Sequence, residues 1–263
     1  MTNEEAFFKV EERDMYFPIE KGKRRLYEKT EGYKGIINAD KDQLISVVSK
    51  NYTLIKHVEV VRMVRKVLSN YRVEENIRVA QEGAQMFARF ALDNDKSELR
   101  RGDIIKPIIE VSNCYDMTFR LGFELCAERL VCTNGMRLPI KISKVARKHI
   151  GTVAEDFTKS LAEVVNKWKD ALGIWRSWST LKVEPATGYA VIESIDGLPK
   201  KFRRQVTERW MSEPGDSTIY DLYNHLTWVT SHTLETTVDR QRELEIVSSK
   251  QFEEALRKQA VIA

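Results

Sequence analysis

The chain has 263 residues, 42% of them apolar, which suffices for one substantial core with an appended helical region and excludes a chain that is disordered throughout. Lys and Arg number 43 against 39 Asp and Glu, so the net charge of +4 permits a basic patch without demanding a polyanionic partner. Because no apolar run approaches the roughly 18 residues of a transmembrane helix and the polar start lacks a signal-peptide core, we expect a cytoplasmic protein without a membrane partner.

Three regions are expected along the chain. Residues 1–40 form a charged N-terminal arm, an irregular lead-in that contains the cluster EKGKRRLYEK and orders only against a partner. Residues 41–180 form an α+β core domain, and residues 181–263 form a mainly helical C-terminal region that packs on the core or extends it. The predicted fold class is α+β, with an antiparallel β-meander packed against long helices.

The core domain begins with a strand and an amphipathic helix. The run LISVVS from Leu44 is typical of a strand. Val58, Val61, Val64 and Leu68 then share one face of a helix.

Strand candidates follow in close succession and indicate a meander. They are RVEENIRVA, AQMFARFAL, DIIKPIIEVSN, MTFRLGFELCA and RLVC, separated by Gly83, the loop DNDKSELRRG and other polar breaks. Met86, Ala88 and Phe90 alternate with Phe87 and Arg89, as in a sheet with one buried face. We predict an antiparallel sheet of about four or five strands over residues 71–133, because the connections between neighbours are short.

The predicted elements after this sheet are mostly helical. The Asn134-Gly135 pair ends the last strand with residues that tolerate positive φ, and Pro139 is suited to the first turn of a helix over RLPIKISKVARKHIG. An apolar stripe then predicts one long helix through Phe157, Leu161, Val164, Trp168, Leu172 and Trp175. We expect a loop with a short extended piece over TLKVEPATGYAVIESIDGLP, and helices in KKFRRQVTERWM, IYDLYNHLTWVTSH and SSKQFEEALRKQA.

The cysteines and histidines do not form a metal-ligand pattern. Cys114, Cys126 and Cys132 are odd in number and include no CxxC pair, so we expect reduced, mostly buried thiols. No metal and no cofactor are predicted.

Basic residues supply the candidate nucleic-acid-binding site. Lys141, Lys144 and Lys148 would form one cationic edge of the predicted helix over RLPIKISKVARKHIG, where they could follow phosphates. A solvated helix surface explains these charges about as well. The candidate site also includes further cations near this helix and in a later run: Arg129, Arg137, Arg147, Lys200, Lys201, Arg203 and Arg204.

Motifs of catalysis are missing from the sequence. It has no GxxxxGK[ST] loop, GxSxG elbow, HExxH pair or glycine-rich dinucleotide fingerprint, and we predict no catalytic residue and no enzyme. A two-metal nuclease built from Asp103, Glu110 and Asp116 stays open as an alternative, against the commoner interpretation that these acids lie at strand ends and turns.

Several segments in this order resemble the phage/plasmid-like protein family, a domain of unknown function common in prophages, plasmids and bacteriophages. The resemblance spans roughly residues 44–235. Its segments are NYTLIKHVEVV, GAQMFARFAL, GDIIKPIIEVSNCYDMTFRLGF, ERLVCTNGM, a basic helix ending in RKHIG, and YDLYNHLTWVTSH. The most specific pieces are the N-x-Y-D turn at Asn113 to Asp116, the R-L-V-C-x-N-G-M stretch and the late Y-D-L-Y-N-x-L-T, with Cys114 where the family has a serine-like or small residue.

The resemblance implies a function in DNA recombination or replication. Distant kinship has been suggested between such phage proteins and the single-strand annealing proteins of the recombination-mediator superfamily, in which a curved antiparallel sheet packs on a long helix and the chains assemble into rings. We therefore expect a homo-oligomer in the host cytoplasm that binds single-stranded DNA and promotes annealing, without a cofactor. A host-defence inhibitor that acts by protein–protein interaction is the main alternative.

Overall fold

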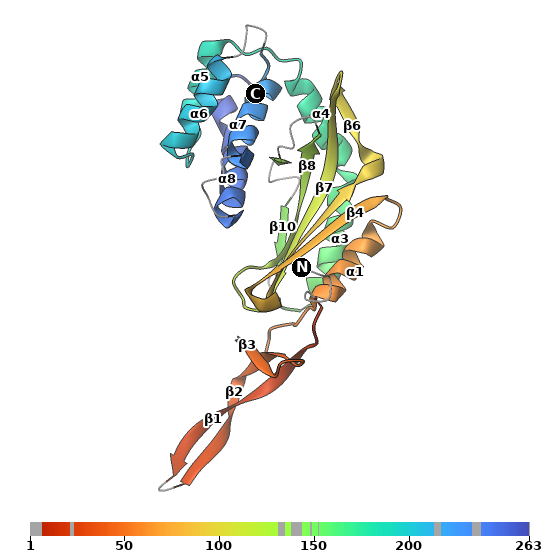
Figure 1. Cartoon of the computed structure of the whole chain (residues 1–263), viewed down its shortest axis with the longest axis vertical. Coiled ribbons are helices and arrows are strands. Elements are labelled where there is room, and N and C mark those ends of the chain that lie inside the picture. The colour runs from red at the N-terminus through yellow and green to blue at the C-terminus, as the bar shows by residue number, and fades with distance from the viewer. Residues whose placement is uncertain are drawn as a thin grey trace. The chain divides into compact units, whose positions relative to one another are not determined.

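The structure is a computed structural model that describes residues 7–21, 24–130, 135–137, 144–147, 149–151, 153–212, 217–232 and 238–262. Two antiparallel sheets and several helices form an α+β structure, as predicted from the sequence (Figure 1). Within these ranges no helix combines the length and the apolar composition required to cross a bilayer.

The chain divides into two compact units. Unit 1 contains residues Met1–Phe90, Ile109–Glu124 and Val145–Glu163, and unit 2 contains Ala91–Ile108, Leu125–Lys144 and Val164–Ala263. The boundary falls within individual strands, because four strands of the larger sheet contribute residues to both units.

The small sheet belongs to unit 1 and has the order β1 (Val10–Lys21), β2 (Arg24–Asn38), β3 (Gln43–Ser49). β3 pairs only with the second half of β2, from Tyr33 to Asn38. Beyond it, β1 and β2 continue as a two-stranded ribbon (Figure 1). The predicted irregular lead-in is therefore wrong, because both strands contain aromatic and aliphatic residues that favour extended structure and their backbone groups pair with each other.

The large sheet is a meander in which neighbouring strands follow one another along the chain. Its order is β10-β8-β7-β5-β4, with β6 paired to β7 and β9 paired to β8. The strands are β4 (Val73–Ala80), β5 (Gln85–Leu92), β6 (Ser97–Arg100), β7 (Asp103–Cys114), β8 (Leu121–Arg129), β9 (Gly135–Arg137) and β10 (Lys144–Arg147). The described part of residues 71–133 confirms the predicted antiparallel sheet, and Met86, Ala88 and Phe90 are buried as the alternation indicated.

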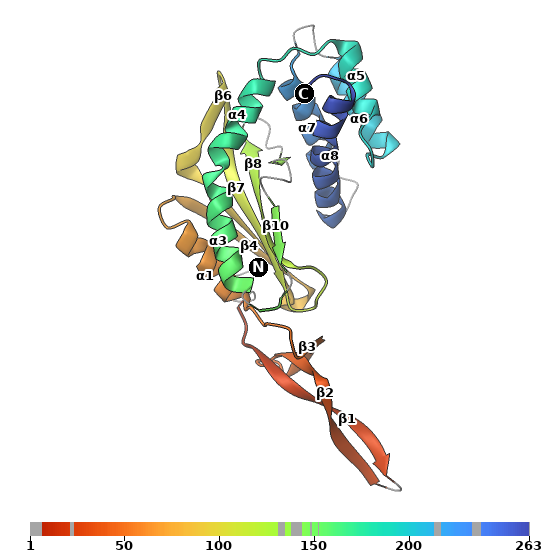
Figure 2. The same cartoon turned by 180° about the vertical axis from the view of Figure 1, so that it is seen from behind.

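Two helices of unit 1 bury apolar faces. α1 (His57–Val67) buries Val60, Val61 and Val64, close to the predicted stripe. α3 (Val153–Asn166) crosses a face of the large sheet (Figure 2). There the ring of Phe157 meets Phe123 of β8 edge-on, with 5.2 Å between the ring centroids.

Unit 2 is mainly helical. Its helices are α4 (Trp168–Trp178), α5 (Pro185–Glu193), α6 (Lys200–Met211), α7 (Ile219–His232) and α8 (Val238–Lys258). Trp178, Tyr223 and Phe252 bring together α4, α7 and α8, with ring centroids 5.1–5.5 Å apart.

Two helix predictions need correction. All six apolar residues of the predicted long helix are buried, but Lys167 leaves helical geometry (φ −81°, ψ 1°) and separates α3 from α4. The loop predicted from Thr180 onward contains α5, because Pro185 occupies the start of a helix, where its fixed φ is favourable and its missing N–H costs nothing.

Candidate nucleic-acid interface

The stretch expected to be a basic helix is extended where the structure describes it. Residues Gly135–Arg137 form β9 and Lys144–Arg147 form β10, and both strands pair with β8. Pairing satisfies backbone groups that β8 would otherwise leave open at the sheet edge, and this gain outweighs the helical spacing of the lysines. The predicted helix is therefore wrong over the described residues 137 and 144–147, so the helical spacing from which the cationic edge was predicted does not apply to Lys144.

The cations of this stretch nevertheless form an uninterrupted basic segment, which we define as residues 129–154. It contains six Lys and Arg residues and no Asp or Glu. Arg137 belongs to β9, and Lys144 and Arg147 belong to β10. Lys141 and Lys148 lie outside the described residues.

Arg129, the first cation of the basic segment, is engaged inside unit 2. Its Nε donates a hydrogen bond to Asp103 Oδ1 at 2.6 Å, and its guanidinium carbon lies 5.9 Å from the centroid of the Tyr220 ring. The Asp103 side chain is almost fully buried, so this ion pair compensates a carboxylate removed from water. A structural role thus accounts for Arg129, and a role in nucleic-acid binding stays a prediction.

The later basic run lies on α6. Lys201 and Arg204 are exposed, and Arg204 pairs with Glu208 one turn further along the helix, at 2.8 Å. Arg203 points back to the preceding loop, where its Nη2 donates to the carbonyl oxygen of Ile195 at 3.0 Å. Lys200 at the helix start is exposed, but Arg203 is partly buried, so the four cations do not share one exposed face.

The late Y-D-L-Y-N motif builds the start of α7. Thr218 and Asp221 form reciprocal hydrogen bonds: Thr218 N donates to Asp221 Oδ2 at 2.9 Å, and Asp221 N donates to Thr218 Oγ1 at 3.3 Å. Arg100 of β6 binds both oxygens of Asp221, at 2.7 and 3.2 Å, and lies over the Tyr220 ring. Burial raises the pKa of Asp221, but the hydrogen bonds from Arg100 and Thr218 outweigh this and hold the pKa below its usual range.

The N-x-Y-D motif builds a buried polar cluster in unit 1, which we call the His57 cluster. Asn113 Nδ2 lies 2.9 Å from His57 Nδ1 and donates to the carbonyl oxygen of Ile55 at 3.0 Å. His57 Nε2 lies 3.1 Å from the carbonyl oxygen of Gly83, and Tyr115 stacks on the imidazole with its hydroxyl oxygen 2.7 Å from His57 N. Since Nδ1 accepts and Nε2 donates, the geometry fits the neutral imidazole.

Electrostatics support this assignment. Burial lowers the pKa of His57 to about 3, the nearby His149 lowers it slightly further, and the Gly83 carbonyl and Asp116 oppose the shift. Burial also lowers the pKa of His149, whose ring stacks on Tyr52 with centroids 5.0 Å apart. Burial raises the pKa of Tyr115.

A family match covers both motif clusters. The family model described as "Domain of unknown function (DUF932)" matches residues 44–260. The chain belongs to the DUF932 family. Comparisons with curated proteins and with solved structures found no match.

The DUF932 match separates two parts of the small sheet. It includes nearly all of β3, the His57 cluster and the start of α7, but neither β1 nor β2. Two of the three motifs that looked most specific in the sequence therefore have structural roles inside the DUF932 domain, since one caps a helix and the other forms a buried polar cluster. The third, R-L-V-C-x-N-G-M, lies partly outside the described residues. The family description assigns no activity to them.

The acids of the proposed nuclease do not converge. Asp103 begins β7 and Asp116 follows its end, a separation of roughly 40 Å at the rise of an extended strand. Asp103 binds Arg129, whereas Asp116 accepts hydrogen bonds from Gln85 and Thr118.

A different set of potential metal ligands lies on β7 and β8. Glu110, Glu124 and Cys126 offer ligand atoms within 4.8 Å of one another, the one such group among the described residues. Buried acids beside a thiol occur without a metal, and we assign none here. Cys114 and Cys126 are thiols outside any disulfide and are buried as predicted, and Cys132 lies outside the described residues.

Sequence reasoning missed the exposed aromatic residues of β1 and β2. Large side chains exposed to solvent include Tyr16 and Phe17 on β1 and Leu26 and Tyr27 on β2. A signal was present, because two runs of aromatic and aliphatic residues flank Gly22 in the cluster EKGKRR, a pattern typical of a hairpin.

Proposed function

We propose that this chain is a non-enzymatic single-stranded DNA-binding protein that holds strands along the basic segment and promotes their annealing in recombination or replication. The observation that carries this proposal is the composition of residues 129–154, six cations without one acid in a chain whose net charge is only +4. Arg129 is paired with Asp103, but a segment that is rich in cations and contains no acid of its own can neutralise phosphates and release counterions, which favours binding to a polyanion at low salt.

Annealing needs no catalytic residue. A protein that lowers the repulsion between two phosphate backbones and keeps the bases accessible accelerates pairing through charge and geometry alone. The strands β9 and β10 place parts of the basic segment along the edge of a sheet, where an extended polyanion could follow them. Edge cations also prevent sheets from pairing with other chains, so DNA binding must be tested directly.

We further propose a phage or plasmid origin and a distant relation to the annealing proteins of the recombination-mediator superfamily. The antiparallel meander crossed by α3 is compatible with this relation. Assembly into a homo-oligomeric ring belongs to the same proposal.

Binding of labelled single-stranded and duplex DNA across a salt series tests the proposal, with light scattering to measure mass. Replacing Lys141, Lys144 and Lys148 by Gln should weaken binding irrespective of base sequence. It should also reduce the salt slope by about two units, because each phosphate contact contributes roughly 0.7 on single strands.

A control variant removes equal charge elsewhere, from the exposed positions Arg62, Lys66 and Lys250 on α1 and α8. It should retain at least most of the wild-type slope. Equal losses of affinity and salt slope in both variants would show that binding depends only on the net charge of the protein, and would contradict a site on the basic segment. No binding of the wild type at low salt would reject the proposed function and favour a protein-interaction role.

A further inference from the structure

The two-stranded ribbon beyond β3 lacks the support that such a structure normally needs. We define the outer ribbon as the paired stretches Tyr16–Lys21 and Arg24–Lys29. A bulge between Asp14 and Tyr16 and the positive φ of Gly32 (87°) separate it from the three-stranded part. An isolated hairpin is marginally stable in water, so a ribbon of this length is expected to gain stability from a partner.

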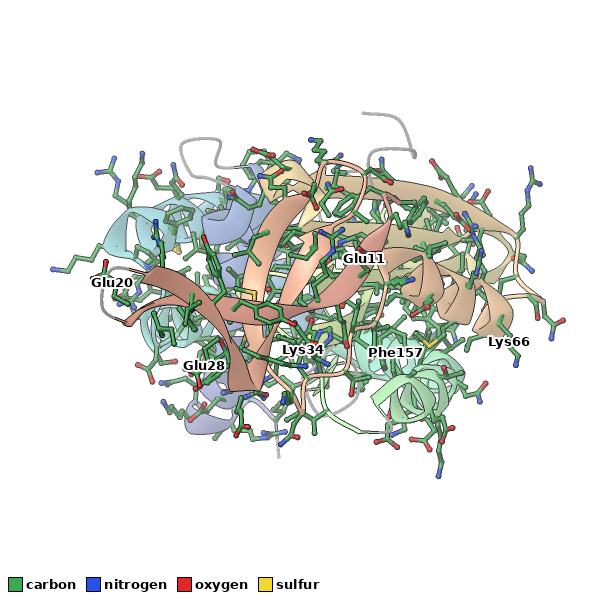
Figure 3. The ribbon with its side chains drawn as sticks, turned by 90° about the horizontal axis from the view of Figure 1, so that it is seen from below. Glu11, Glu20, Glu28, Lys34, Lys66 and Phe157 are labelled. Atoms are coloured by element: carbon green, nitrogen blue, oxygen red, sulfur yellow. The ribbon has the colours of Figure 1, made fainter. Side chains whose placement is uncertain are left out.

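Large apolar side chains on the outer ribbon are exposed on both faces. The exposed fractions are 55% for Tyr16, 58% for Phe17, 43% for Leu26 and 68% for Tyr27. Figure 3 shows the ribbon end-on with Glu20 and Glu28 along it. Ordinary surfaces expose such residues singly, whereas four within one hairpin indicate a binding surface.

The register sorts these residues into two different faces. Tyr16 lies opposite Lys29, and Tyr27 lies opposite Pro18 and two residues from Arg25, so these residues share one face, the tyrosine face. Phe17 lies opposite Glu28, and Ile19 opposite Leu26, on the other face. The tyrosine face thus carries Arg25, Tyr27 and Lys29 at alternate positions of one strand, with Tyr16 diagonally across at roughly 7–8 Å.

Charge indicates the kind of partner. Residues 16–29 contain five Lys and Arg against two Glu. Two copies of such a basic ribbon would repel each other at low salt, whereas a polyanion would be attracted. Because each base has a flat face that can stack on a phenol, rings between cations fit an unpaired nucleic-acid strand.

We infer that the tyrosine face of the outer ribbon is a second nucleic-acid site, at which bases of a single strand stack on Tyr16 and Tyr27 while Arg25 contacts phosphate. This inference rests on the proposed function and assigns the strand a contact that lies outside the DUF932 match. Lys29 forms an ion pair with Asp14, and Glu20 lies opposite Arg25 in the register, so Arg25 is the cation of this face that we assign to the phosphate contact.

The test uses the full chain and a fluorescent oligothymidine across a salt series. Replacing Tyr16 and Tyr27 by Ala should weaken binding at least about tenfold, because stacking on each ring contributes appreciably to affinity. The salt slope should stay unchanged, since no charge is removed. Arg25→Gln should instead lower the slope by about 0.7.

A matched control replaces Phe17 and Leu26, on the opposite face of the same ribbon, by Ala. Binding by this variant should stay within about twofold of the wild type if stacking on the tyrosine face is the cause. Equal losses in the two double variants, or a fall in mass by light scattering that accompanies the loss in Y16A/Y27A, would overturn the inference in favour of a contact between copies.

Oligothymidine binding by the wild type and by Y16A/Y27A distinguishes a failure of this inference from a failure of the proposed function. Wild-type binding that Y16A/Y27A leaves intact removes the ribbon site and retains the proposed function. A wild type that binds no oligothymidine at low salt removes both.

Discussion

His57 carries a ring that the fold keeps neutral. Asn113 donates to one imidazole nitrogen, and the other nitrogen donates to the Gly83 carbonyl, so an added proton at Nδ1 would face an N–H group. The pKa of about 3 in the folded state lies far below the ordinary value of 6.5. The unfolded chain therefore binds a proton below pH 6.5 that the folded chain excludes.

We expect the free energy of unfolding to fall as the pH is lowered from 6.5 toward 3. Stability from the neutral imidazole is fully present above pH 6.5. About 2 kcal/mol of it should be lost between pH 7 and pH 5. Urea unfolding of the wild type and of His57→Gln at these two pH values measures the effect.

The variant should be less stable at pH 7 and should lose less stability on acidification. A smaller dependence should remain in it, because burial also lowers the pKa of His149. Equal losses in the two proteins would show that His57 is not the group responsible.

At this scale the sequence predicts which side chains are buried better than it predicts their partners. Met86, Ala88 and Phe90 follow from a period of two along one strand, which needs no long-range information. The bond between His57 and Asn113 joins residues far apart in the chain, and only the fold brings them together. The same holds for Arg100 and Asp221.

Helices α5 and α6 approach so closely that one residue of α5 has to be glycine. An added Cβ on Gly188 would overlap the indole of Trp210. That indole is almost fully buried and donates from Nε1 to the Pro185 carbonyl at 3.0 Å, so it cannot easily move away. The contact explains why a residue of low helix propensity stands inside this helix.

Gly188→Ala should lower the free energy of unfolding by about 1–3 kcal/mol, the usual cost of overpacking a core. Gly173 on α4 provides the matched control, because an added Cβ there meets no atom within 4 Å. Gly173→Ala should raise stability by up to about 1 kcal/mol through helix propensity. Thermal or urea unfolding distinguishes the two, and similar shifts in the same direction would contradict the packing argument.

Buried faces with a strong local period were predicted correctly, whereas helix boundaries and elements that depend on a distant partner were not. The stripe through α3 and α4 and the alternation in β5 are local properties. β10 becomes a strand because β8 offers it an open edge, a fact that lies outside the residues 144–147 themselves. The cations of the basic segment can be recognised from the sequence by residue type. Their arrangement in space cannot, because the spacing predicted for a helix does not apply to the strands β9 and β10.

The two compact units share β5, β7, β8 and β10. All five Trp residues belong to unit 2, at positions 168, 175, 178, 210 and 228. Tryptophan fluorescence therefore reports unit 2 alone, whereas His57 lies in unit 1.

Continuous strands should couple the two units in unfolding. We expect His57→Gln to shift the urea midpoint detected by tryptophan fluorescence as much as the midpoint detected by far-ultraviolet circular dichroism, because strands that enter both units lose their order together. A fluorescence midpoint that stays at the wild-type value while the dichroism midpoint moves would show that the units unfold separately.

The position of the cross-strand pair Asp14 and Lys34 at the base of the ribbon means that the ribbon can change without changing the rest of the chain. These residues are direct partners on adjacent strands, so their backbones are only about 5 Å apart. The chain segment between them therefore starts and ends at nearly the same point in space. Insertions or deletions within the outer ribbon, from Tyr16 to Lys29, change the length of the hairpin without moving the residues of the DUF932 match. Evolution could therefore lengthen, shorten or exchange this ribbon at little cost to the stability of the domain that carries it.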